Sequence, residues 1–495
     1  MSAVRSRRRL MAVLLLGLAA HARAATNSVI AAYFIQWGIY DRNYHVTNIP
    51  ADLVTHIHYA FARPAFYSAT TGAALESMDS WADYEKPYPG DDGDPFKGSF
   101  NQLLKLKRRF PHVQTLISAG GWTDSDDFSD IVAYSNARAA FVESCLTFIT
   151  NYGFDGIDFD WEYPVEGGEA GLTHRPEDRT NFLALVREMR DRLDVQGAAD
   201  GRRYLVTIAA SADYASLTTR FAVAEMSACL DWINLMTYDF AGPWDAATGH
   251  DSPLYGNPAA PNPSYNIHTS VQTCLSNGVP AGRIVIGIPF YGRGFKDVPT
   301  NDAGLFQSHG GDSDEGSWEA GTFDYKDLRD GTRTNAFINQ AGFVRHWDDT
   351  SKVPWLFHPT SHVFITYEDE VSVGLKARYA LAQSLGGVMF WSQDADTDDA
   401  QLQRAIYRVF YPTRLRPAGG LELSWQAWTG RCYAVDFVPD LDGAWGACAT
   451  LVDTSGAPVT VVTGVSGRIT LADTGTAAFA RGFYKIKASS TNEFP

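Results

Sequence analysis

Residues 154–164 place four acidic side chains within eight positions: Asp155, Asp158, Asp160 and Glu162. The residues between them are mostly large and apolar, and such residues favour strands. In a strand, side chains alternate between faces, so Asp158, Asp160 and Glu162 would share one face and span roughly 13 Å. Unpaired buried carboxylates are costly, and neighbouring carboxylates move one another's pKa values apart. The row is therefore typical of an acid–base site rather than of a purely structural strand.

Short apolar segments alternate with helical patterns from residue 28 to residue 411, which predicts strand–helix units around a parallel sheet. One predicted helix carries apolar residues at positions 182, 185, 186 and 189, the spacing of an amphipathic stripe. Eight such units predict an α/β fold, a (β/α)8 barrel, with its chemistry at the carboxyl ends of the strands. The expected strands are 30–36, 54–61, 114–118, the acidic stretch, 205–210, 232–238, 284–289 and 387–391.

The N-terminus resembles a secretion signal over residues 1–24. Four arginines precede an apolar run that is too short to span a bilayer, and residues 22–24 form an A-x-A-like cleavage site. We therefore expect a secreted protein, extracellular or periplasmic, with no membrane association after cleavage.

Three further boundaries follow from the composition. The barrel is expected over residues 25–411, interrupted by a small α+β insertion at 295–364. A Pro- and Gly-rich linker at 412–420 leads to a small all-β, sandwich-like module at 421–495. Residues 63–100 are expected to form a long functional loop. Pairing of Cys432 with Cys448 stays open.

Charge and aromatic content narrow the ligand class. A formal charge of −16 argues against a nucleic-acid partner. The chain has 13 Trp, 23 Tyr and 28 Phe, which suit a core and also provide surfaces on which sugars stack. His56 and His58 could share a strand face but lack a third ligand, so we expect no metal and no cofactor. We expect a monomer.

The acidic stretch resembles the D-x-x-D-x-D-x-E signature of family 18 glycoside hydrolases, the chitinase family. Residues 118–121 resemble the S-x-G-G motif of that family, and residues 236–239 resemble its M-x-Y-D motif. The resemblance implies a deep groove with the insertion as one wall. The substrate-binding residues that it suggests are Tyr33, Phe61, Gly121, Trp122, Met236, Asp239, Trp244, Tyr291, Arg293 and Trp391, although Tyr33 and Phe61 could equally belong to the barrel core.

The resemblance also implies a reaction. Glu162 would be the general acid, Asp160 would orient the 2-acetamido group that attacks in place of a protein nucleophile, Asp158 would share a proton with Asp160, and Tyr238 would hold the acetamido carbonyl. The expected substrate is chitin or chito-oligosaccharides, cleaved with retention of configuration. Two alternatives remain open, an endo-β-N-acetylglucosaminidase acting on glycoprotein glycans and a non-catalytic chitin-binding lectin.

Overall fold

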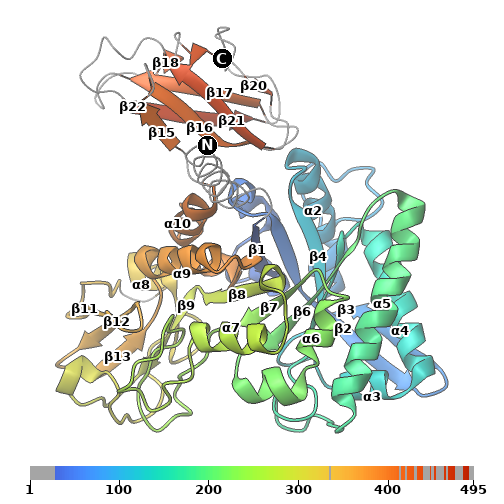
Figure 1. Ribbon diagram of the computed structural model, residues 1–495, viewed down its shortest axis with the longest axis horizontal. Helices are drawn as coiled ribbons and strands as arrows, with labels where there is room; N and C mark the ends of the chain where they lie inside the picture. Colours follow the sequence, from blue (N-terminus) through green and yellow to red (C-terminus); the bar gives the residue numbers. More distant parts are fainter. Residues whose placement is uncertain are drawn as a thin grey trace, which may run out of the picture.

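The computed structural model describes residues 28–333 and 336–411 in full and, beyond residue 411, the backbone of β15–β22. Eight parallel strands close into a barrel because β1 pairs with both β14 and β2 (Figure 1). The predicted (β/α)8 fold is confirmed. The barrel strands are β1 (Val29–Ile35), β2 (His56–Ser68), β4 (Gln114–Gly120), β5 (Gly156–Asp160), β6 (Leu205–Ser211), β7 (Trp232–Met236), β8 (Ile284–Pro289) and β14 (Gly387–Trp391).

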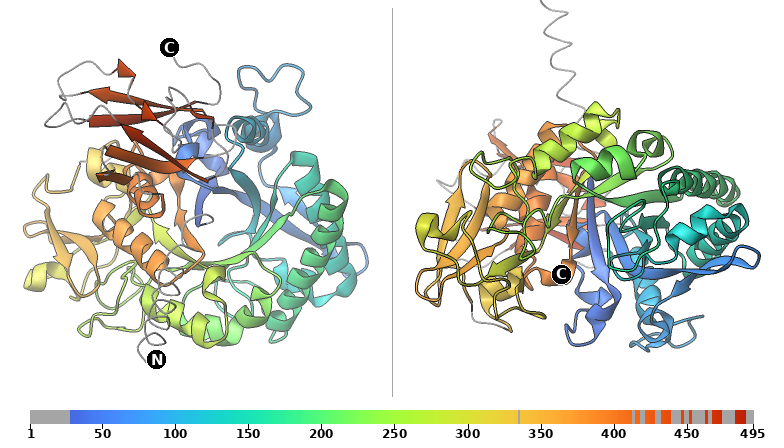
Figure 2. Two further views of the ribbon diagram at one scale, coloured as in Figure 1. Left: turned by 45° about the horizontal axis from the view of Figure 1, so that its top comes forward. Right: turned by 90° about the horizontal axis from the view of Figure 1, so that it is seen from below.

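Helices cover the outside of the barrel (Figures 1 and 2). The predicted stripe on α5 is buried, as Phe182, Leu185, Val186 and Met189 all pack into the core. Between β1 and β2 the connection forms only the short 3₁₀ turns η1 (Gln36–Ile39), η2 (Val46–Asn48) and η3 (Ala51–Leu53). The helices are α2 (Gly98–Arg109), α3 (Phe128–Ala133), α4 (Ser135–Tyr152), α5 (Asp178–Asp200), α6 (Val223–Ser227), α7 (Ile267–Ser276), α9 (Glu370–Ala382) and α10 (Gln401–Phe410).

The prediction of a long loop over residues 63–100 is wrong for its first part. Strand β2 continues to Ser68 and pairs antiparallel with β3 (Gly72–Ser77), and the single turn η4 (Trp81–Glu85) follows. The hairpin packs against α4, where the main-chain amide of Leu75 donates to Oγ of Ser144 at 3.0 Å. The Asp, Gly and Pro residues on which the expectation rested lie mostly after β3, between residues 79 and 95.

The insertion between β8 and β14 forms a five-stranded antiparallel sheet in the order β10-β9-β13-β12-β11. It lies at the left of the barrel in Figure 1. A core of its own contains Phe295, Trp355, Phe357 and Phe364. Only one residue separates the sheet from β8, so its first strand begins before the predicted start at residue 295. Its elements are β9 (Tyr291–Phe295), β10 (Thr322–Asp324), α8 (Tyr325–Asp330), β11 (Val344–Asp348), β12 (Val353–His358) and β13 (Val363–Thr366).

The C-terminal segment contains antiparallel strands in two sheets, β15-β16-β21-β19 and β18-β17-β20, with β22 also paired to β17. Strand β15 lies inside the predicted linker. The predicted signal at residues 1–24 lies outside the described residues. The predicted pairing of Cys432 with Cys448 concerns side chains that also lie outside the described part of the chain. Among the described residues, no helix is long and apolar enough to cross a membrane. The strands are β15 (Arg414–Pro417), β16 (Leu421–Ala427), β17 (Cys432–Val438), β18 (Gly446–Ala447), β19 (Leu451–Val452), β20 (Val462–Thr463), β21 (Gly467–Asp473) and β22 (Phe483–Ser489).

Candidate active site

Strand β5 carries the acidic row to the carboxyl end of the barrel. Asp158 and Asp160 belong to the strand, and Glu162 follows two residues after its end. The intervening side chains of Ile157, Phe159 and Trp161 are buried in the layer between barrel and helices, as the alternation predicts. At the other end of β5, Asp155 forms ion pairs with two cationic side chains, a structural role.

Asp158 is fully buried and has hydrogen-bond donors on both carboxylate oxygens. Burial alone would raise its pKa, but the nearby His58, 3.3 Å from Oδ2, and the hydroxyl donors hold the pKa below its ordinary value. These contacts favour the ionised form of Asp158 at the bottom of the site. Its donors are Tyr33 (2.8 Å) and Ser118 (2.5 Å) at Oδ2, and Thr207 (2.6 Å) and Asn234 (3.2 Å) at Oδ1.

Asp160 and Glu162 have environments that favour the protonated carboxyl. Burial raises the pKa of Asp160 well above its ordinary value, and the charges of Glu162 and Asp158 raise it further. Oδ1 of Asp160 is buried and accepts no hydrogen bond from the described residues. Burial, opposed by a hydrogen bond with Tyr163 and assisted by the charge of Asp239, raises the pKa of Glu162 to about 7. Glu162 can thus hold a proton near neutral pH and release it, as a general acid must.

Two glycines at the end of β4 allow the chain to pass close to the acids. A Cβ on Gly120 would lie 2.3 Å from the carbonyl oxygen of Asp160, and one on Gly121 would lie 2.7 Å from the ring of Phe61. Both have positive φ, +105° and +91°. Oγ of Ser125 donates to the Gly121 carbonyl at 2.8 Å and accepts from the Glu162 amide at 2.9 Å. The loop after β4 thereby fixes the backbone that carries the acid.

The end of β7 supplies a second polar group. Tyr238 is partly buried, and burial and the charges of Asp160 and Glu162 raise the pKa of its hydroxyl, so it remains a hydrogen-bond donor. The carboxylate of Asp239 accepts from the Tyr291 hydroxyl at 2.8 Å and pairs with Arg293 at 2.6 Å. The Arg293 guanidinium lies 5.0 Å from the ring centre of Trp244. Because Tyr291 and Arg293 belong to β9, the insertion sheet borders the site.

Aromatic rings form the opposite border. Trp391, the last residue of β14, stacks on Phe61 with ring centres 5.7 Å apart and lies 5.5 Å from Tyr33. Met236 packs in the same apolar group. The exposed ring of Trp37 continues this group, with its centre 6.4 Å from that of Trp391, whereas Trp122 lies near Tyr163 and Trp244 near Arg293. The exposed fractions are 40% for Trp37, 50% for Trp122 and 61% for Trp244.

The structure brings the four predicted catalytic residues and the ten predicted binding residues to one end of the barrel. Tyr33 and Phe61 are almost completely buried, and the Tyr33 hydroxyl serves Asp158 rather than an open surface. Sequence reasoning missed Trp37, which stacks on Phe61 with centres 6.4 Å apart, and Ser125. A Trp directly after the predicted strand 30–36 was an available signal for Trp37, whereas no local pattern marks Ser125.

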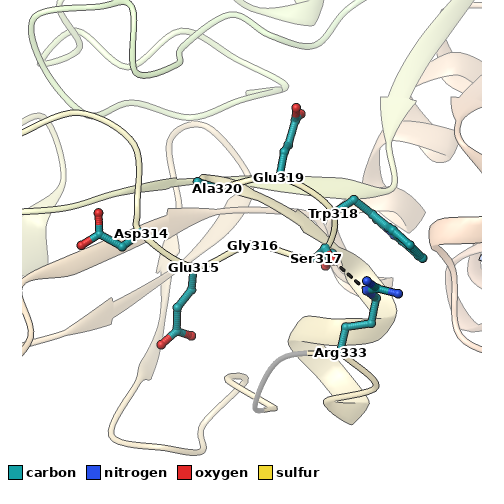
Figure 3. A pocket seen from close by; sticks show the side chains of 8 residues that line it. All are labelled: Asp314, Glu315, Gly316, Ser317, Trp318, Glu319, Ala320 and Arg333. Atoms are coloured by element: carbon teal, nitrogen blue, oxygen red, sulfur yellow. Dashed lines mark hydrogen bonds between the residues drawn. The ribbon is translucent and has the colours of Figure 1, made fainter. Parts of the chain in front are cut away.

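A separate hollow lies in the insertion, lined by residues 314–320 and Arg333 (Figure 3). Arg333 donates to the Ser317 carbonyl at 2.8 Å, and its guanidinium lies 3.5 Å from the ring centre of Trp318. The acidic side chains around the hollow point in different directions in Figure 3, so they do not converge on one ligand. In the described part of the chain, no group of three or more His, Cys, Asp or Glu side chains could hold a metal ion.

Comparisons with known proteins agree with this geometry. The model of glycosyl hydrolases family 18 matches residues 29–396. Chitinase A1 of Niallia circulans is 41% identical over 411 residues, which cover 76% of this chain and 58% of that protein, so the match spans little more than half of the relative. Chitinase 1 of Aphanocladium album is 36% identical over 372 residues, covering 74% of this chain and 81% of the relative.

Solved structures give the same result. A structure of chitinase ChiA74 from Bacillus thuringiensis has a TM-score of 0.72 at 30% identity, covering 90% of this chain and 80% of that one. A family 18 N-acetylglucosaminidase from Paenibacillus barengoltzii has a TM-score of 0.64 at 34% identity, covering 77% of this chain and all of that one.

Proposed function

Because this chain belongs to glycosyl hydrolases family 18, and is thus a glycoside hydrolase, we propose that its substrate is chitin. It would cleave β-1,4 bonds between N-acetylglucosamine units with retention of configuration. The observation that carries the proposal is the row of carboxyls at the end of β5. Four hydrogen-bond donors and a lowered pKa favour the anion of Asp158, whereas burial raises the pKa of Glu162 to about 7. The names of the similar proteins support chitin as the substrate.

In the first step, Glu162 protonates the glycosidic oxygen as the C1–O bond breaks. The acetamido oxygen of the same sugar bonds to C1 and forms an oxazolinium ion, so no protein nucleophile is required. Tyr238 donates a hydrogen bond to the acetamido group, and Asp160 orients it. In the second step, water attacks C1 and gives a proton to the Glu162 carboxylate, while the bond between C1 and the acetamido oxygen breaks and the acetamido group is restored. The two displacements at C1 each invert, which gives net retention.

The charge state of Asp160 suits these two reaction steps. In the empty site, burial and two neighbouring carboxylates favour its neutral form. A positive oxazolinium beside it reverses that preference, since an opposite charge favours the ionised carboxyl. Asp160 would then share its proton with Asp158 and become negative when the intermediate needs stabilisation, and the pair titrates as one coupled system.

The aromatic and insertion borders suit a linear sugar polymer. Trp391 provides a floor for the reacting sugar, and the exposed rings of Trp122 and Trp244 provide further stacking surfaces. The insertion contributes Tyr291 and Arg293 to the second wall. We propose that this wall favours chitin over branched glycoprotein glycans.

Substitution of the acid tests the proposal. Glu162→Gln preserves the shape and removes the donated proton, so turnover of chito-oligosaccharides should fall by about 10²–10⁴-fold while calorimetric binding survives. Exposed Glu169→Gln is the matched control and should leave turnover unchanged. A Glu162→Gln enzyme with a tenth of normal activity would place the acid elsewhere.

Substrate choice needs its own assay. Chitin oligomers labelled at the reducing end should be cleaved, whereas a high-mannose glycopeptide should remain intact. Efficient release of the glycan would instead support an endo-β-N-acetylglucosaminidase.

Secretion is a further part of the proposal. We infer it from residues 1–24 alone, which resemble a secretion signal. N-terminal sequencing of protein recovered outside the cell should begin just after Ala24. An intact N-terminus on active protein would contradict it.

A further inference from the structure

Asp251 lies behind the end of β7 and is only 1% exposed. Its Oδ1 accepts from the main-chain amide of Asp239 at 2.8 Å, and its carbonyl oxygen accepts from the amide of Phe240 at 3.0 Å. Its own amide donates to Oγ1 of Thr366, the last residue of β13, at 3.0 Å. Asp251 therefore joins the end of a barrel strand to the insertion sheet.

The next residue holds the chain on the other side of Tyr238. Oγ of Ser252 donates to the carbonyl of Thr237 at 2.6 Å, and Nζ of the buried Lys376 donates to the same Oγ at 2.9 Å. Asp251 and Ser252 thus fix the backbone immediately before and after the tyrosine.

Asp239 needs such support because its backbone is unusual. Its φ is +56°, in the left-handed region that non-glycine residues avoid. In this conformation its carboxylate meets the Tyr291 hydroxyl and the Arg293 guanidinium. From there its negative charge also helps to raise the pKa of Glu162. Displacement of Asp239 would reduce that effect.

We propose that Asp251 is a positioning residue for hydrolysis, whose Oδ1, by accepting the Asp239 amide, holds the Asp239 carboxylate where its charge acts on Glu162. The inference rests on the proposed role of Glu162 as the acid. It assigns Asp251 no contact with the substrate.

The accepting oxygen, and not a negative charge, is what this role requires. Burial and the charge of Asp239 raise the pKa of Asp251 well above its ordinary value, which favours the neutral carboxyl. Its Oδ2 is buried and has no hydrogen-bond partner in the described part of the chain. An asparagine would present the same accepting oxygen. The titratable groups that face Asp251 are Asp239, Arg293, Glu368 and Lys376, and those that face Glu162 are Asp160, Asp239, Tyr163 and Tyr238.

The test compares Asp251→Asn with Asp251→Leu, which have similar shapes but differ in the accepting oxygen. The measurement is kcat/KM against pH on a chito-oligosaccharide with the full chain. The Leu variant should move the alkaline limb to lower pH by on the order of one unit, as Asp239→Asn should, because a like charge has been weakened or removed. The Asn variant should keep the alkaline limb of the kcat/KM profile at the wild-type pH. Asp251→Ala replaces the Leu variant if leucine prevents folding.

Asp396 provides the matched control, since it is another buried aspartate that accepts main-chain amides, those of Thr397, Leu402 and Gln403. Asp396→Leu should lower stability without moving the limb. In an Asp239→Asn background, Asp251→Leu should cause no additional shift.

Three results would overturn the inference. The first is an alkaline limb at the wild-type pH in both Asp251→Leu and Asp251→Ala, and the second is a limb that moves as far in Asp251→Asn as in Asp251→Leu. The third is a shift by Asp251→Leu that is as large in the Asp239→Asn background as in the parent protein. Failure of the proposed function would be recognised by a different result: Glu162→Gln would then remain active, whatever the substitution at residue 251.

Discussion

Glu162→Gln should stabilise the folded protein in alkaline solution, although it should also inactivate the enzyme. The pKa of this carboxyl is about 7 in the folded protein, against an ordinary value of 4.5. Between these values the folded protein holds a proton that the unfolded chain releases, so stability falls as pH rises from 4.5 to 7. At roughly 1.36 kcal/mol per pH unit, the loss is about 3 kcal/mol above that range. Glutamine does not ionise and avoids the loss.

Thermal unfolding followed by calorimetry measures the effect. An unfolding entropy of about 2.1 cal/mol/K per residue, summed over the roughly 380 residues of the barrel and insertion, gives about 0.8 kcal/mol/K. The expected increase in Tm is therefore about 4 °C at about pH 8.5, and it should nearly vanish at about pH 4, where both forms are protonated. Glu169→Gln, at an exposed position, should change Tm little at either pH.

The reasoning would be refuted by a Tm difference between Glu162→Gln and the parent protein that is the same at both pH values. It would also be refuted by a variant that is less stable than the parent only in alkaline solution, since that result requires a lowered pKa for Glu162.

Three further predictions concern residues around the site. Asp155→Asn should cost about 2 kcal/mol in urea unfolding through weakened charged hydrogen bonds, and should leave kcat unchanged because this residue lies at the other end of β5. Gly121→Ala should lower both Tm and kcat, since its φ is +91° and the new Cβ would lie 2.7 Å from the Phe61 ring; unchanged kinetics would show that the ring moves freely. Lys376→Met should destabilise by about 3–5 kcal/mol because it leaves the Glu368 carboxyl buried and unpaired, and Glu368→Gln in the same chain should recover much of the loss.

Local sequence patterns predicted the barrel and the acidic row. The period of two around Asp158 and Asp160 depends only on the strand itself, and the strand–helix alternation depends only on apolar spacing. Each barrel strand lies close to its predicted position. The hairpin of β2 and β3 escaped prediction because its pairing and its burial against α4 are tertiary effects that composition does not report.

The support of the site was much less accessible from sequence. Ser118, Thr207 and Asn234 donate to Asp158 from three other strands, and only the register of the barrel brings them together. Asp251 follows Asp239 by twelve positions in an irregular segment, with no periodicity that would indicate their contact. Motif matching identifies the residues that we propose face the sugar, whereas the residues behind them require the folded geometry.

The most direct test of the proposed mechanism uses partially deacetylated chitosan and identifies the sugar at each new reducing end. If the acetamido group is the nucleophile and Glu162 is the acid, nearly every new reducing end should be N-acetylglucosamine, because cleavage requires that group on the reacting sugar. Frequent glucosamine at those ends, or a glycosyl ester trapped on Asp160, would contradict the account and indicate a nucleophile supplied by the protein.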